Sequence, residues 1–222
     1  MLGVPRMRDL RAFLAAGVMT VSLAGCDGLT DVLDVFGKSK VPLPGERVAD
    51  KDMANVQVVL PAPVVNDSWP QSGGFTNYAM HHLAVSDSPK MIWTADVGSG
   101  SSSSRILTTP PVMANGMVFA KDAQSQVSAF DADTGKLIWR VTLEPDKARD
   151  TDEFGGGLAY YGGRLYVTTG FAAVFALDPS NGKEIWTSSV SAPVRGAPLV
   201  FSDRVFVIAI DNKLQSMAAV EG

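Results

Sequence analysis

The ten-residue pattern "FDADTGKLIW", which begins at Phe130, returns as "LDPSNGKEIW" forty-seven positions later. In each copy an acidic residue precedes a Gly-Lys pair, and a tryptophan follows the glycine by four positions. An acidic side chain can cap a tight turn, and glycine adopts a positive φ at no steric cost. The pattern therefore predicts tight turns containing Gly135 and Gly182, followed by strands that carry Trp139 and Trp186.

The sequence around these turns repeats with a similar period. Segments such as "GMVFAKD", "RLYVTT" and "RVFVIAI" are short, rich in β-branched and aromatic residues, and separated by turn signals. Such a pattern predicts many short strands. We place the copies near residues 110–143, 157–190 and 196–222. An earlier half-copy, "MIWTADVG", contains Trp93, and we expect a strand to start there as well.

A period of 40–47 residues with about four strands is typical of a β-propeller blade. A β-sandwich or a barrel would also alternate strands with turns, but it would not repeat a Gly-Lys-x-x-Trp signal at fixed spacing. We therefore expect an all-β fold in residues 68–222, built from β-propeller repeats of four-stranded antiparallel blades. About two and a half blades fit, which leaves the ring incomplete. Because Gly222 aligns with the two turn glycines, the third blade should lack its outer strand, as in a truncated protein.

The recurring tryptophans are candidates for structural docking positions. Contact between neighbouring blades supplies the core of a propeller, and a buried aromatic side chain removes about 150–250 Å² from water. We expect Trp93, Trp139 and Trp186 each to dock one blade on its neighbour, next to turns that contain Gly135 and Gly182.

The first 25 residues have the features of a secretory signal. Arg6, Arg8 and Arg11 precede the apolar stretch "AFLAAGVMTVSLAG", which is too short to span a bilayer comfortably. The sequence "LAGC" ends at Cys26, the single cysteine of the chain, and resembles a bacterial lipobox, which predicts lipid attachment at Cys26. A plain signal-peptidase site beside a chance small residue is the alternative. We expect residues 26–67, interrupted by prolines, to form a lipid-anchored linker.

Composition and motifs exclude several classes of function. A net charge of −4, with no basic stripe beyond the first dozen residues, argues against nucleic-acid binding. "DADTG" resembles the start of a calcium loop, but Thr142 stands where an EF-hand has its glutamate. His81 and His82 would point to opposite faces of a strand, and "GSGSSSS" and "EFGGGLAYYGG" lack a nucleotide-binding framework. We therefore predict no catalytic residue, no metal site and no cofactor.

The repeats "VSAFDADTGKLIW" and "VFALDPSNGKEIW" resemble those of pyrroloquinoline-quinone-type β-propellers. With "IWTADVGSG", "APVRGAPLVFSDRVFV" and the lipobox, residues 66–222 resemble most the BamB-type lipoprotein subunits of the outer-membrane β-barrel assembly machinery. That resemblance implies an eight-bladed, non-enzymatic scaffold that docks on the barrel-inserting subunit and works with the other members of that machinery. A fragment of a periplasmic quinone-dependent dehydrogenase and a general periplasmic protein-binding propeller are the alternatives.

The same resemblance implies a place at the periplasmic face of the outer membrane, held there by the lipid anchor. Asp27 follows the cysteine, and in enteric bacteria an aspartate at this position favours retention in the inner membrane. The inner membrane is therefore the alternative location.

Overall fold

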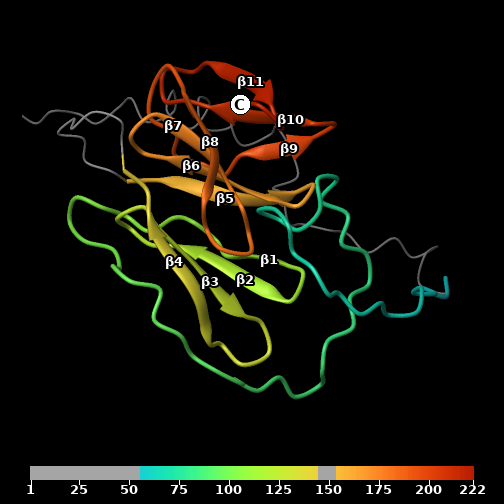
Figure 1. Cartoon of the computed structure of the whole chain (residues 1–222). Helices are drawn as coiled ribbons and strands as arrows, with labels where there is room; N and C mark the ends of the chain where they lie inside the picture. Colours follow the sequence, from blue (N-terminus) through green and yellow to red (C-terminus); the bar gives the residue numbers. More distant parts are fainter. Residues whose placement is uncertain (1–55, 145–153) are drawn as a thin grey trace, which may run out of the picture. The chain divides into compact units, whose positions relative to one another are not determined.

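The computed structural model describes residues 56–144 and 154–222. Within these ranges the chain forms eleven strands in three antiparallel sheets and no α-helix (Figure 1). The elements all belong to one unit, Val59–Gly222. The signal segment, Cys26 and Asp27 lie outside the described residues. No helix among the described residues is long and apolar enough to cross a membrane.

The first two sheets are four-stranded meanders. The first runs in the order β1 (Val112–Ala114), β2 (Met117–Lys121), β3 (Gln126–Asp131) and β4 (Leu137–Thr142). The second repeats this order with β5 (Gly156–Tyr161), β6 (Arg164–Thr169), β7 (Ala173–Leu177) and β8 (Glu184–Ser189). These are the two predicted four-stranded antiparallel blades, blade 1 and blade 2.

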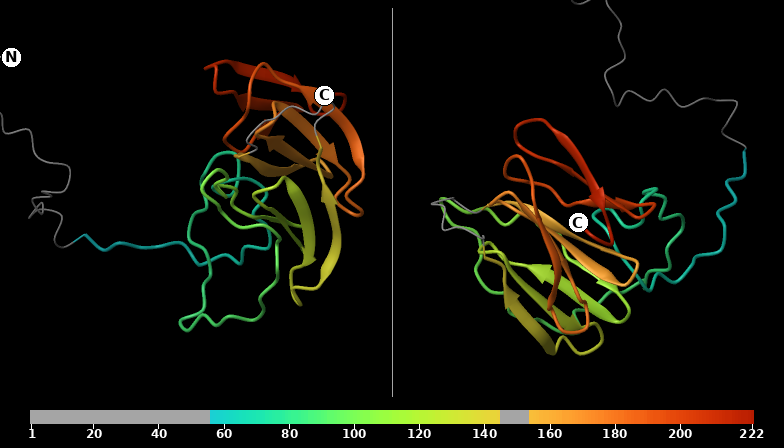
Figure 2. Two further views of the ribbon diagram at one scale, coloured as in Figure 1. Left: turned by 90° about the vertical axis from the view of Figure 1, so that its left-hand side faces the viewer. Right: turned by 45° about the horizontal axis from the view of Figure 1, so that its top comes forward.

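The third sheet contains three strands: β9 (Leu199–Phe201), β10 (Arg204–Ile208) and β11 (Leu214–Ala218). It has the order of the first three strands of a blade, so the prediction that blade 3 lacks its outer strand is confirmed. The expected two and a half blades are therefore present and form an open arrangement. Figures 1 and 2 show the three sheets side by side in chain order.

The blades bury apolar side chains between their faces, as their alternating strands require. One cluster joins blade 1 to blade 2 and includes Phe119, Val127, Leu158 and Val167. A second cluster joins blade 2 to blade 3 and includes Tyr166, Val174, Val200 and Val205. Each face of blade 2 therefore contributes to a different core.

An irregular segment before blade 1 crosses the first strand of all three blades. The backbone of Trp69 exchanges two hydrogen bonds with Met113 of β1, at 2.7 and 2.9 Å, and the Pro70 carbonyl accepts from the Tyr160 amide of β5 at 2.6 Å. The buried amide of Gln71 then reaches β9. Its Nε2 donates to the Val200 carbonyl at 2.9 Å, and its Oε1 accepts from the Val200 amide at 3.2 Å. This segment, Trp69–Gln71, therefore ties the three blades together.

One element differs from the sequence expectation. Trp139 and Trp186 lie third in β4 and β8, as predicted, but residues 91–97 around Trp93 form no strand. A strand needs a hydrogen-bonding partner, and no strand among the described residues pairs with this segment. The expectation that Trp93 starts a strand is therefore wrong for the fold as it stands.

Candidate functional site

The three repeat tryptophans make the same contact, each from one blade-like segment to the next. The indole Nε1 of Trp93 donates to the Ala132 carbonyl at 2.9 Å. The indole of Trp139 donates to the Pro179 carbonyl at 2.7 Å. The indole of Trp186 donates to the Ala219 carbonyl at 3.1 Å, and the three acceptors occupy equivalent positions in the repeat.

A glycine at the end of each acceptor turn leaves room for the indole. A Cβ atom added to Gly135 would lie 2.6 Å from Trp93, and one added to Gly182 would lie 2.6 Å from Trp139. The same atom on Gly222 would lie 2.8 Å from Trp186. The three glycines also have positive φ angles, 69°, 74° and 91° in chain order. Glycine is therefore required at these positions both by the turn and by the docked ring.

Aspartates hold the first two of these turns. Asp131 Oδ1 accepts from the backbone and the hydroxyl of Thr134, at 2.8 and 2.6 Å. Asp178 Oδ1 accepts from the backbone and the hydroxyl of Ser180, at 2.8 and 2.7 Å. The hydroxyl bonds are the largest cause of a lowered pKa in both carboxyl groups, because they favour the ionised form. The third turn has Ala218 at this position and lacks the cap.

The other motifs considered from the sequence have local structural roles. The "GSGSSSS" loop attaches to blade 1 through the Ser99 amide, which donates to the buried Asp122 carboxylate at 2.9 Å. Nδ1 of His82 lies 2.7 Å from the Pro61 carbonyl oxygen. The glycines of "EFGGGLAYYGG" open β5, where a Cβ atom on Gly157 would lie 2.4 Å from the Cα atom of Ala197. In residues 56–144 and 154–222, no three His, Cys, Asp or Glu side chains gather as a metal site would require.

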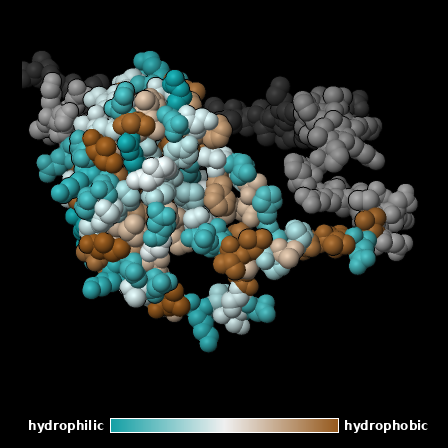
Figure 3. Space-filling view, turned by 45° about the vertical axis from the view of Figure 1, so that its right-hand side comes forward, coloured by the Kyte–Doolittle hydropathy of each residue, from teal (hydrophilic) through white to brown (hydrophobic). Residues whose placement is uncertain are grey.

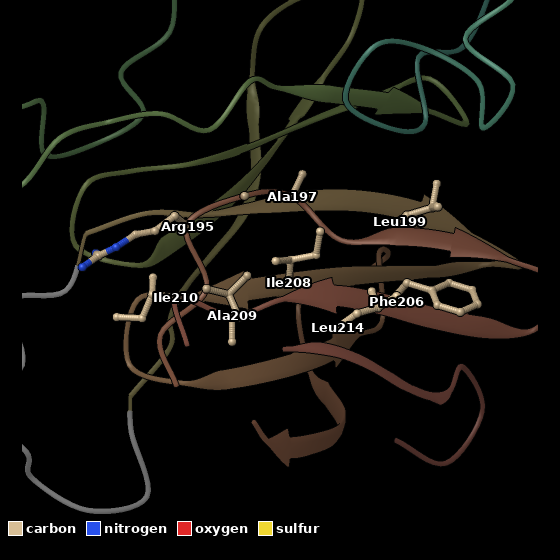
Figure 4. A pocket seen from close by; sticks show the side chains of 10 residues that line it. Arg195, Ala197, Leu199, Phe206, Ile208, Ala209, Ile210 and Leu214 are labelled. Carbon is tan, nitrogen blue, oxygen red and sulfur yellow. The ribbon is translucent and has the colours of Figure 1, made fainter. Parts of the chain in front are cut away.

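Blade 3 carries a hollow of about 460 Å³ on the face turned away from blade 2. Figure 4 shows the apolar side chains of β9, β10 and β11 along it, and Arg195 extending from one end. The Arg195 guanidinium lies 3.6 Å from the ring centroid of Phe154 and donates to the Phe154 carbonyl. The hollow is lined by Val194, Arg195, Gly196, Ala197, Leu199, Phe206, Ile208, Ala209, Ile210 and Leu214.

The hollow repeats a face that is covered in blade 2. Leu199, Phe206 and Leu214 occupy the repeat positions of Ala159, Tyr166 and Val174, which pack against blade 3. In blade 3, however, 67% of the Leu214 surface is exposed. Exposed hydrophobic side chains appear as separate brown areas among hydrophilic ones on the side seen in Figure 3. The face of blade 3 that carries the hollow is therefore apolar and partly exposed.

Sequence reasoning missed two parts of this arrangement. It did not identify Gln71, because a single glutamine in an irregular segment carries no recurring signal. It also did not identify the aromatic partners of the tryptophans: the Phe119 ring lies 6.0 Å from Trp139, and the Tyr166 ring lies 6.0 Å from Trp186. Phe119 and Tyr166 are forty-seven positions apart, so the repeat could have revealed them.

Comparison with known proteins identifies relatives with the same repeat. The outer membrane protein assembly factor BamB of Salmonella typhimurium is 34% identical over 115 residues, which cover 50% of this chain and 29% of that protein. The quinohemoprotein alcohol dehydrogenase of Comamonas testosteroni is 30% identical over 155 residues, which cover 63% of this chain and 21% of that protein. The crystal structure of that dehydrogenase matches with a TM-score of 0.57 at 22% identity. The match covers 70% of this chain and 26% of the dehydrogenase chain.

These relatives bear on the chain in different ways. The structural match, at 22% identity, shows the fold alone, which is that of a β-propeller. The chain spans between 21% and 29% of the length of the two sequence relatives above. A family model described as outer membrane protein assembly factor BamB matches residues 81–148 and 123–222, which is more than half of the chain. The chain therefore belongs to the family of the outer membrane protein assembly factor BamB.

Proposed function

We propose that the protein is a non-enzymatic scaffold that assists the assembly and insertion of outer-membrane β-barrel proteins. The observation that carries this proposal is the BamB family match over residues 81–148 and 123–222. The partners proposed are the barrel-inserting subunit and the other members of the β-barrel assembly machinery.

The proposal is tested in the bacterium that encodes the chain. Depletion of the protein should reduce the amount of folded β-barrel protein in the outer membrane, measured by heat-modifiable mobility on gels. The tagged full-length chain, extracted in mild detergent, should retain the barrel-inserting subunit. Normal barrel assembly after depletion, together with no retention of that subunit, would refute the scaffold role.

A membrane anchor at Cys26 forms a second part of the proposal. The lipobox resemblance supports lipid attachment, with the chain held at the periplasmic face of the outer membrane. Acyl chains at the N-terminus would provide stable anchoring where a single chain is marginal. Growth with labelled palmitate should label the chain, and Cys26→Ser should abolish the label. Density separation of the two membranes would then decide between outer-membrane placement and the inner-membrane alternative suggested by Asp27.

A quinone-dependent dehydrogenase is the second candidate function, because the Comamonas testosteroni dehydrogenase shares 30% identity over 155 residues. The purified full-length chain, supplied with pyrroloquinoline quinone and calcium, should reduce an electron-accepting dye in the presence of alcohols if this candidate is correct. We expect no alcohol-dependent reduction. A rate above that of the chain without quinone would replace the scaffold proposal.

A further inference from the structure

The inner edges of the three blades are covered by the segment that precedes blade 1. Strands β1, β5 and β9 each lie at an edge of their sheet, so each has backbone groups that no strand of its own sheet pairs on that side. Trp69 forms an isolated antiparallel bridge with Met113 of β1, and Gln71 forms one with Ala159 of β5. The Gln71 side chain also bonds to the backbone of β9. Residues 69–74, which we call the strap, therefore occupy places where another strand could pair.

The strap ends in a tight turn that two later side chains cover. Gln71 and Gly74 exchange two backbone hydrogen bonds, at 3.0 and 2.9 Å. A Cβ atom added to Gly73 would lie 2.5 Å from the Tyr78 ring, and one added to Gly74 would meet the sulfur atom of Met80. The Tyr78 ring and the Met80 thioether therefore pack directly against the turn. We call the segment that carries them, residues 78–81, the clamp.

The clamp has a strained backbone. Tyr78 and His81 have φ angles of 54° and 53°, in the left-handed region that residues other than glycine rarely adopt. Such angles persist only where the surrounding structure imposes them, and they cluster at ligand clamps and switch regions. Both side chains are exposed, so their burial does not offset the strain. The contacts between the clamp and the turn of the strap offset it, and departure of the strap allows the clamp to relax.

The strap is attached to the blades by few contacts in the part of the chain that the structure describes. Trp69 exchanges two backbone hydrogen bonds with Met113, and Pro70 accepts one from Tyr160. Trp69 and Pro70 are half-buried, whereas Gln71 is buried. A segment with few buried apolar contacts opens at a lower free energy than the strands of a core. The strap can therefore leave the inner edges without unfolding of the blades.

We propose that the strap is a releasable cover of the inner blade edges, and that the uncovered edge of β1 accepts an extended strand of another polypeptide. The strap shows the geometry of this pairing, because the backbone of Trp69 bonds to Met113 as an antiparallel strand would. Such an edge binds through main-chain groups, so the partner must offer an extended backbone. The inference goes beyond the scaffold role, because neither barrel assembly nor retention of the barrel-inserting subunit measures the position of the strap.

Hydrogen exchange on the full-length chain tests whether the strap opens. The Met113 amide donates to Trp69 and the Tyr160 amide donates to Pro70, so both should exchange faster than the amides of β3 and β7, which lie inside the sheets. A second variant combines Trp69→Cys with Met113→Cys, because the Cα atoms of such a pair lie about 5.5 Å apart, within the range of a disulfide. Oxidation of this variant should abolish the faster exchange at both positions, and reduction should restore it. Equal exchange rates at all these amides in the unsubstituted chain overturn the proposal.

A glycine at position 81 tests the strain in the clamp. His81→Gly removes the strain of the left-handed backbone from the closed state, so it should slow exchange of the Met113 and Tyr160 amides about tenfold. Ala84→Gly is the matched control, because Ala84 is also exposed but its φ is not positive. This control should slow neither amide. Unchanged rates in His81→Gly, or equal slowing in both variants, overturn release against a strained clamp.

A peptide tests whether the uncovered edge accepts a strand. The probe is a fluorescent peptide with the sequence of residues 66–74, "NDSWPQSGG". Fluorescence anisotropy should show saturable binding to the reduced cysteine variant and none to the oxidised variant, in which the locked strap occupies the edge. A control peptide that is N-methylated at the tryptophan cannot donate to the carbonyl at position 113 and should bind neither form. Equal binding of the probe to both forms, or no binding to the reduced form, overturns the acceptance of a strand.

Discussion

The indole of Trp139 lies so close to Gly182 that a Cβ atom on that glycine would lie 2.6 Å from Cε3 of the ring. One residue is in the outer strand of blade 1 and the other is in a turn of blade 2. The indole Nε1 also donates to the Pro179 carbonyl of the same turn. The recurring sequence pattern therefore links neighbouring blades: the tryptophan of one copy fits the glycine of the next.

Replacing Gly182 with alanine should therefore destabilise the fold. The added Cβ atom meets the Trp139 ring, and the φ of 74° is strained for alanine. Together these effects should cost about 2–4 kcal/mol of unfolding free energy. Urea denaturation of the full-length chain measures the loss. Gly163→Ala is the matched control, because Gly163 has a φ of 77° and open space around its Cα; an equal loss in both variants would contradict the role of the indole contact.

Removal of the indole should have a larger effect. Trp139 is 9% exposed, so Trp139→Ala leaves a cavity between blades 1 and 2 and an unpaired Pro179 carbonyl. We expect a loss of about 3–5 kcal/mol in unfolding free energy. Ile138→Ala, in the same strand but 47% exposed, should cost less than half as much. Comparable denaturation midpoints for the two variants would show that the indole does not stabilise the contact between blades.

The sequence was sufficient to predict the blades because their signals are local and recur. The turn that contains Gly135 reads the same as the turn that contains Gly182, and each is followed by a tryptophan at fixed distance. Period-two alternation in between follows from the burial of strand faces. Fold class, blade number and the missing outer strand of blade 3 could all be inferred from these patterns.

Other features depend on contacts between distant residues and leave no periodic signal. Gln71 contacts Val200, 129 positions away, through a side chain in an irregular segment. The segment around Trp93 illustrates a different difficulty. Its sequence matches that of an outer strand, but a strand forms only where a neighbouring strand offers hydrogen-bonding partners. The local sequence around Trp93 resembles that of β4 and β8 but carries no information about a neighbouring strand.

Acid should weaken the first two turns. Hydrogen bonds lower the pKa of Asp131 and Asp178 in the folded protein, chiefly those from the Thr134 and Ser180 hydroxyls. A carboxyl group with a lowered folded-state pKa stabilises the fold fully above its unfolded-state pKa of about 3.9. That contribution is lost as the pH falls from the unfolded-state pKa through the lower folded-state pKa. Unfolding free energy should therefore decrease between about pH 5 and pH 2.

The double variant Asp131→Asn and Asp178→Asn provides the control for this acid effect. Asparagine retains an acceptor oxygen for the Thr134 and Ser180 donors but has no carboxyl proton to bind. The variant should be less stable than the unsubstituted chain at pH 7, and its stability should change less with pH below 5. Urea denaturation at a series of pH values measures how the unfolding free energy of each protein changes with pH. If the unfolding free energies of the variant and the unsubstituted chain change equally with pH, other carboxyl groups cause the acid sensitivity.

The link from Gln71 to Val200 should be necessary for the attachment of blade 3. Both atoms of the glutamine amide bond to the backbone of a residue that is 0% exposed. Gln71→Ala leaves the Val200 amide and carbonyl without these partners, which should cost about 2–4 kcal/mol of unfolding free energy. The variant should also increase the hydrogen-exchange rate of the Val200 amide more than the rates of the β3 amides. The control is Gln124→Ala. Gln124 is exposed, and its side chain accepts only from the Ser99 hydroxyl among the described contacts, so this variant should change neither measurement.

Gln71→Glu separates the donor from the acceptor. A carboxylate could still accept from the Val200 amide, but it would face the Val200 carbonyl without a proton to donate. Burial and this carbonyl should raise the pKa of the new carboxyl group, so the sign reverses relative to the aspartates. The variant should be least stable at neutral pH and should regain stability relative to the unsubstituted chain as the pH falls through that raised pKa. A constant difference in unfolding free energy between pH 7 and pH 5 would contradict a raised pKa for the new carboxyl group.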